Sequence, residues 1–168
     1  MPLSMYQASV PAFLQMLSSL SAILDKAETY AAERKIDPAV LLNYRLAPDM
    51  FPLSRQVQIA ADHAKGCCAR LAGREVPQYP DDETSFADLR ARIARTVAFV
   101  QGFEPGDIDG SEEREIALTV GGRPMRFQGQ HYLVNFVLPN FYFHATTAYA
   151  ILRHAGLPIG KRDFMGAV

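Results

Sequence analysis

Residues 129–156 have the sequence GQHYLVNFVLPNFYFHATTAYAILRHAG, and this stretch decides the predicted fold. Residues three or four positions apart share one face of a helix. One such face carries Leu133, Val137, Asn140, His144, Thr147 and Ile151. Because this face is apolar at both ends, we expect it to point into the protein core. Pro139 lacks a backbone N–H group and is expected to bend the helix just before Asn140.

Two polar side chains, Asn140 and His144, lie one helical turn apart in the middle of this face. An amide or imidazole buried there without a partner would cost about 1 to 3 kcal/mol. Both side chains must therefore bond neighbouring helices or water, or hold a ligand or metal. The residues themselves leave these alternatives open.

Composition and charge restrict the class of protein. The chain has 168 residues, 49% of them apolar and 21% charged, which is typical of one folded domain spanning residues 1–168. A net charge of -1 provides no basic surface for nucleic acid, and no stretch is long and apolar enough to span a membrane. The only cysteines, Cys67 and Cys68, are adjacent and poorly placed to pair with each other, so we expect a cytoplasmic protein.

Three further amphipathic segments precede the last helix. Each has a candidate N-cap residue, which is Ser4 for the first helix, Ser54 for the second and Thr84 for the third. The first helix is expected to end before Pro38, and the second is joined to the third by a short linker. The arginines of the third helix, Arg90, Arg92 and Arg95, are expected to form a solvated face.

Residues 115–120 and 123–127 alternate in polarity around Gly121-Gly122, which predicts a β-hairpin. The predicted fold is therefore all-α, a four-helix bundle with a small β-hairpin inserted before the last helix.

Several stretches of the chain resemble the DinB-like (DinB/YfiT-like) superfamily of four-helix proteins. The last helix has a histidine, His144, followed nine residues later by Arg153 and then by Gly156. Residues 46–53 (LAPDMFPL), 55–62 (RQVQIAAD) and 138–144 (LPNFYFH) more closely resemble an uncharacterised bacterial family within that superfamily. The resemblance covers nearly the whole chain and implies an up-down-down-up bundle.

The resemblance also implies a candidate metal site. Many DinB-like proteins hold a divalent metal with one histidine from the second helix and an HxxxH pair from the last. His144 matches the second histidine of this pair, Asn140 replaces the first, and the position on the second helix falls near Gln58 or Asp62. His63 is nearby but lies outside the apolar stripe of that helix. The implied metal is zinc, nickel or manganese.

Two functions follow from these observations, and the sequence does not decide whether the protein is an enzyme. We favour a homodimeric small-molecule-binding or structural protein with a degenerate metal site, in which aromatic residues such as Tyr142 and Tyr149 contribute to binding. The alternative is a divalent-metal-dependent transferase or isomerase of the DinB-like kind, which uses a thiol cofactor and His144. No catalytic residue is assigned, because the acidic clusters lie in expected loops without an apolar surround.

Overall fold

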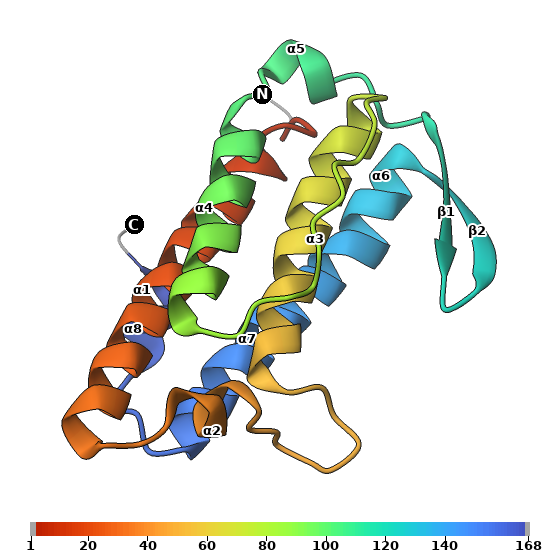
Figure 1. Cartoon of the computed structure of the whole chain (residues 1–168). Helices are drawn as coiled ribbons and strands as arrows, with labels where there is room; N and C mark the ends of the chain where they lie inside the picture. Colours follow the sequence, from red (N-terminus) through yellow and green to blue (C-terminus); the bar gives the residue numbers. More distant parts are fainter. Residues whose placement is uncertain (1–2, 167–168) are drawn as a thin grey trace.

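Four long helices form the body of the protein in a computed structural model that describes residues 3–166. They are α1 (Val10–Arg34), α3 (Leu53–Leu71), α4 (Phe86–Gln101) and α7 (Leu138–His154). Helix α3 is central, because it packs against both α4 and α7, while α1 packs mainly against α4. Figure 1 shows that α1 and α7 run in one direction and α3 and α4 in the other.

The helices begin close to the predicted caps but not at them. Helix α1 starts after Ser9, whereas Ser4 accepts a hydrogen bond from the Gln7 amide in a preceding turn. Helix α3 begins after Pro52, so that Ser54 lies in its first turn. Helix α4 is capped by Ser85 rather than Thr84, because Ser85 and Asp88 exchange the two hydrogen bonds of a capping box. Each of these three helices therefore begins at a different residue from the one predicted.

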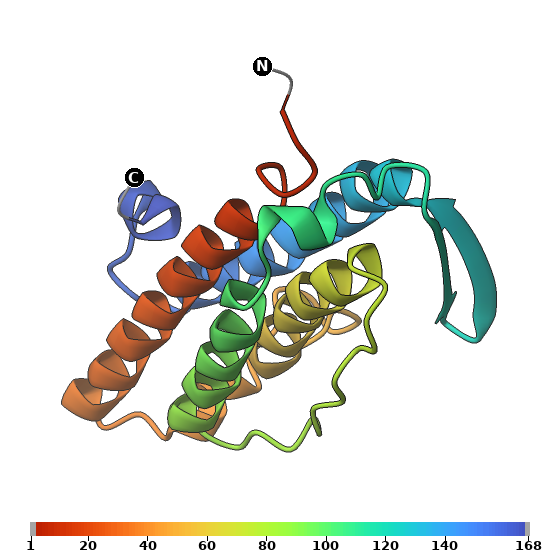
Figure 2. The ribbon, with the colours of Figure 1, turned by 90° about the horizontal axis from the view of Figure 1, so that it is seen from above.

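The connection between α3 and α4 differs from the expected short linker. Because these two helices are parallel, residues 72–85 must return along their whole length, as Figure 2 shows. Arg92 of α4 holds this connector by donating a hydrogen bond to the carbonyl oxygen of Pro80, at 2.9 Å. The other connection, between α1 and α3, contains the short helix α2 (Pro38–Leu42).

The last helix is continuous but not uniformly α-helical. It begins as α6 (Gly129–His131), widens into the π-helical segment η1 (Tyr132–Val137) and continues as α7. The Leu138 amide donates to the carbonyl of Leu133, five residues back, at the turn that precedes Pro139. A wide turn next to a proline is a common way to accommodate the missing N–H group. The irregularity that the structure shows near Pro139 is therefore a π-helical segment, which ends at Val137.

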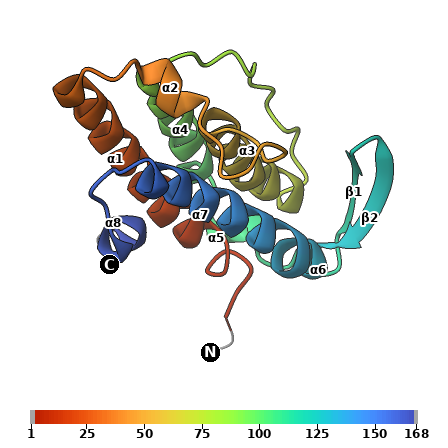
Figure 3. The ribbon, with the colours of Figure 1, turned by 90° about the horizontal axis from the view of Figure 1, so that it is seen from below.

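The predicted hairpin is present, with β1 (Glu115–Val120) antiparallel to β2 (Arg123–Gln128). Gly121 and Gly122 both have positive φ angles, 55° and 78°, as the tight turn between two twisted strands requires. Figure 3 shows the hairpin projecting from the side of the helices. It is anchored at its base, where Ile116 is buried, while Leu118 and Phe127 are half-buried.

Two short helices complete the fold, α5 (Pro105–Ile108) and α8 (Lys161–Met165). Helix α8 packs on α1. One core joins the long helices, and in it the rings of Phe13 and Phe141 meet edge to face at 4.9 Å. Within residues 3–166, no helix has the length and apolar character needed to cross a membrane.

Candidate functional site

His144 is buried and bonded to the neighbouring long helix. Its Nδ1 atom lies 2.7 Å from Oε1 of Gln56, on α3, and the Gln56 amide nitrogen donates to the carbonyl of Phe51 at 3.0 Å. Because Gln56 Oε1 is then the acceptor, the network assigns the proton to Nδ1 of His144. Burial and the positive charge of Arg55 lower the pKa of His144, so the ring is neutral at pH 7.

Asn140 does not bond His144. Its side-chain amide donates to the carbonyl of Phe136, one turn earlier, at 2.6 Å. The side chain is half-buried, whereas His144 is only 9% exposed. The inward-facing stripe thus continues through His144, and Asn140 lies at its edge.

His63 comes close to the last helix, although sequence reasoning placed it outside the stripe of α3. Its ring lies 5.8 Å from that of Phe136 and 6.1 Å from that of His144, and the two imidazole planes are inclined by only 17°. Burial, with a smaller effect from His144, lowers the pKa of His63 to about 4. His63 is half-buried, which is consistent with a position outside the fully buried stripe. It still reaches the last helix because α3 is covered on two sides, by α4 and by α7.

Gln58 and Asp62 bond to groups on the side of α3 that faces the connector. The Gln58 amide donates to Glu83 at 2.8 Å. One Asp62 oxygen lies 2.9 Å from Arg92 and 3.0 Å from Lys65. The structure therefore does not bring Gln58 together with His144. Asp62 lies at the edge of a cleft that His63 also lines.

The donor set around His144 does not fit a divalent metal in this arrangement. Two imidazoles can share an ion only if their in-plane lone pairs converge within about 2 Å of it. The nearly parallel rings of His63 and His144 do not converge on one point. The bond from Nδ1 of His144 to Gln56 leaves only Nε2 of that ring with a lone pair for a metal. Among the described residues, no group of three or more His, Cys, Asp or Glu side chains is placed to hold a metal.

A cleft of about 340 Å³ lies between α3, η1 and the hairpin. Apolar side chains form much of its wall, namely Ile59, Leu118, Val120 and Phe136. Polar groups also line it, namely Asp62, His63, Arg70, Thr119, Tyr132 and Asn140. Apolar walls with a few placed polar groups are typical of small-molecule sites, and this volume is within their usual range.

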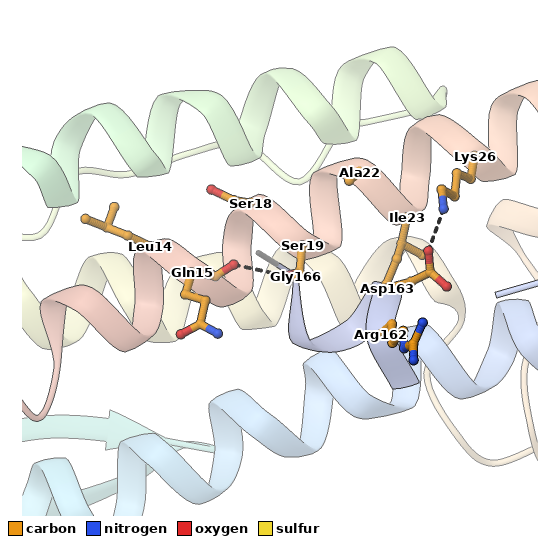
Figure 4. A pocket seen from close by; sticks show the side chains of 10 residues that line it. All are labelled: Leu14, Gln15, Ser18, Ser19, Ala22, Ile23, Lys26, Arg162, Asp163 and Gly166. Carbon is orange, nitrogen blue, oxygen red and sulfur yellow. Dashed lines mark hydrogen bonds and ion pairs between the residues drawn. The ribbon is translucent and has the colours of Figure 1, made fainter. Parts of the chain in front are cut away.

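A larger hollow, of about 600 Å³, lies between α1 and α8 (Figure 4). Several of its polar groups already have partners within the protein. Ser19 donates to the carbonyl of Gln15 at 3.1 Å, and Lys26 pairs with Asp163. The Gln15 amide donates to the carbonyl of Met165 at 2.9 Å. These contacts fasten α8 to α1, so the smaller cleft under the hairpin is the better candidate site.

Tyr142 and Tyr149, the aromatic residues expected to contribute to binding, do not line the hairpin cleft. Tyr142 is 38% exposed and touches the edge of Phe141. Tyr149 is half-buried and packs against Phe164 of α8, with ring centroids 5.7 Å apart. Cys67 and Cys68 are fully buried, and burial raises the pKa of the Cys68 thiol to about 12, so both are core side chains.

Comparison with known proteins places the chain in the DinB-like class of folds. A crystal structure of a DinB family member protein from Shewanella denitrificans has a TM-score of 0.87 and 43% sequence identity, covering 97% of this chain and 92% of that one. Residues 5–165 match the family described as "Domain of unknown function (DUF1993)", and the chain belongs to that family. No curated protein matches the sequence.

Proposed function

We propose that this protein binds a small organic molecule in the cleft between α3, η1 and the hairpin. The observation that supports this most directly is an apolar wall beside an imidazole that has no partner in the described part of the chain. This imidazole is that of His63, which is half-buried in the cleft and makes no hydrogen bond among residues 3–166. We also infer that the four long helices form the up-down-down-up bundle expected of the DinB-like superfamily.

The test is a fragment screen by NMR on ¹⁵N-labelled protein. The expected shifts cluster on residues that line the cleft, such as Thr119 and Asn140. Ile59→Trp should abolish these shifts, because an indole at half-buried Ile59 fills the cleft. Val134→Trp, at a residue of η1 that is 47% exposed, is the matched control and should leave the shifts unchanged. Shifts scattered over the surface, or confined to the hollow between α1 and α8, would refute the proposal.

The alternative is a divalent-metal-dependent transferase or isomerase of the DinB-like kind. It is supported by the position of His63, which brings a second imidazole to 6.1 Å from His144. It requires the two rings to reorient so that they converge on one ion, while the bond from Nδ1 of His144 to Gln56 can remain. Untagged protein incubated with zinc, nickel or manganese should then retain stoichiometric metal, and His144→Ala should lose it. That result would replace the proposal above, whereas no retained metal would remove the alternative.

The expected homodimer belongs to the same proposal. The last helix exposes Val134, Tyr142 and Phe143 by 47%, 38% and 56%, and exposed apolar groups of this size are typical of interaction surfaces. Light scattering at micromolar concentration should give the mass of a dimer, and Phe143→Glu should lower it. A monomeric mass for the unmodified protein would contradict this expectation.

A further inference from the structure

One end of the hairpin cleft is formed by Arg70 and Tyr132. The Arg70 Nη1 atom donates to the Tyr132 hydroxyl at 2.9 Å. The Arg70 side chain extends back along α3 and lies over Gly66. A Cβ atom added at Gly66 would lie 2.5 Å from Nη1 of Arg70. Glycine is less favourable than alanine inside a helix, and the three nearest atoms that such a Cβ would meet all belong to the Arg70 guanidinium. Gly66 therefore allows the guanidinium to lie where it does.

This end of the cleft offers hydrogen-bond donors without a matching anion. Arg70 takes part in none of the ion pairs formed by residues 3–166. The Tyr132 oxygen accepts from Arg70, but its own proton has no acceptor in the described part of the chain. Burial raises the pKa of Tyr132 to about 12, so the group remains a phenol and a donor at neutral pH.

We propose that Arg70 and Tyr132 form the binding site for the anionic group, a carboxylate or phosphate, of a small and partly apolar ligand. This inference rests on the proposed function of the cleft. An oxyanion there would pair with the guanidinium and accept the free phenol proton. Phe136 and Ile59 would contact the apolar part of the ligand. Asp62, the carboxylate at the cleft margin, does not oppose this charge, because Lys65 and Arg92 neutralise it.

The experiment compares three probes that share one ring, namely phenylacetate, phenyl phosphate and the neutral phenylacetamide. Each is titrated into ¹⁵N-labelled protein, and affinity is read from the shifts of cleft residues. At least one anion should bind about ten-fold more tightly than the amide, because charge-assisted hydrogen bonds to a guanidinium are strong. The better of the two anions identifies the group as carboxylate or phosphate.

Three variants assign the effect to this site. Arg70→Gln and Tyr132→Phe should each reduce the preference for the anion, and Gly66→Ala should do the same by displacing the guanidinium while every donor is kept. Arg34→Gln, at an exposed arginine that stacks on Tyr30 of α1, is the control for loss of charge and should leave the preference unchanged.

The outcomes separate this inference from the proposed function. Equal binding of anions and amide in the cleft would overturn the inference and leave the proposed function standing. An anion preference that survives Arg70→Gln and Gly66→Ala would also overturn it. If no probe and no fragment shifts the cleft residues, the proposed function itself fails.

Discussion

An arginine lies on each of two sides of helix α3, and the two arginines differ in whether carboxylates of the protein balance their charge. On the connector side, Arg92 from α4 is almost fully buried and contacts three carboxylates, those of Asp62, Asp81 and Glu83, at 2.8 to 3.0 Å. On the hairpin side, Arg70 is half-buried, and its one hydrogen bond to the described part of the chain goes to the neutral Tyr132 hydroxyl.

The difference indicates two separate roles. The Arg92 cluster is balanced by residues of the chain, and it fixes the connector of residues 72–85 in place, so it serves the fold. Arg70 has no carboxylate partner among residues 3–166 and lines a cleft, so its site is the one available to a ligand. The following experiments test this contrast, from the largest expected effect to the smallest.

Arg92→Met should destabilise the protein by about 3 kcal/mol, because it leaves the nearly buried Glu83 carboxylate without its cation. Urea unfolding followed by circular dichroism measures the loss. Arg126→Met is the matched control, since Arg126 pairs with Glu115 in an exposed ion pair and should change stability by less than about 1 kcal/mol. Equal losses for the two variants would contradict a structural role for the Arg92 cluster.

Lowering the pH should destabilise the fold through His63. The pKa of this group falls from 6.5 to about 4 on folding, so between these values the unfolded chain binds more protons, and stability falls as pH decreases. The loss should reach about 2 kcal/mol at pH 5. His63→Gln should remove this part of the pH dependence in urea unfolding, whereas His131→Gln, at an exposed ring, should retain it. The lowered pKa of His144 adds a contribution of the same sign.

Gln56→Leu should cost about 1 to 2 kcal/mol, because it leaves the buried Nδ1–H of His144 without an acceptor. A double-mutant cycle with His144→Phe measures the coupling of the pair in free energy of unfolding. Strictly additive losses would show that the bond between Gln56 and His144 does not contribute.

Gly66→Ala should raise stability by about 0.5 to 1 kcal/mol, since alanine is the better helix former and the only atoms in the way belong to a flexible side chain. Thermal unfolding measures the gain. A marked decrease in melting temperature would instead show that the Arg70 guanidinium is held too firmly to move. A Gly66→Ala variant that is more stable but binds anions more weakly would show that the Arg70 side of α3 serves ligand binding rather than stability.

Much of the fold could be predicted from sequence because it depends on local patterns. Apolar periodicity located the long helices, Gly121-Gly122 located the hairpin turn, and Pro139 marked the irregular turn in the last helix. Local patterns did not show that the connector returns along the whole length of α3 and α4, because this follows from the parallel direction of the two helices, which only the DinB-like resemblance implied.

The candidate site was only partly predictable. His144 was recognised as a polar group on an inward face, and its burial agrees with that prediction. Arg92 was expected in solvent, but the connector covers it with carboxylates. His63 and Arg70 were not selected, because one stripe was sought on a helix that has neighbours on two sides. Their roles depend on contacts with α7 and η1, which local sequence patterns do not encode.

The π-helical segment determines which aromatic group meets Arg70. A wider turn rotates every preceding side chain about the helix axis relative to a regular α-helix, and this turn lies between Pro139 and the Tyr132 hydroxyl. The direction in which the phenol projects thus depends on a wide turn that ends next to Pro139, which does not itself line the cleft. We expect Pro139→Ala to allow a regular α-helical turn at this point and to turn the Tyr132 side chain away from Arg70. The substitution would then change ligand preference without altering any residue that lines the cleft.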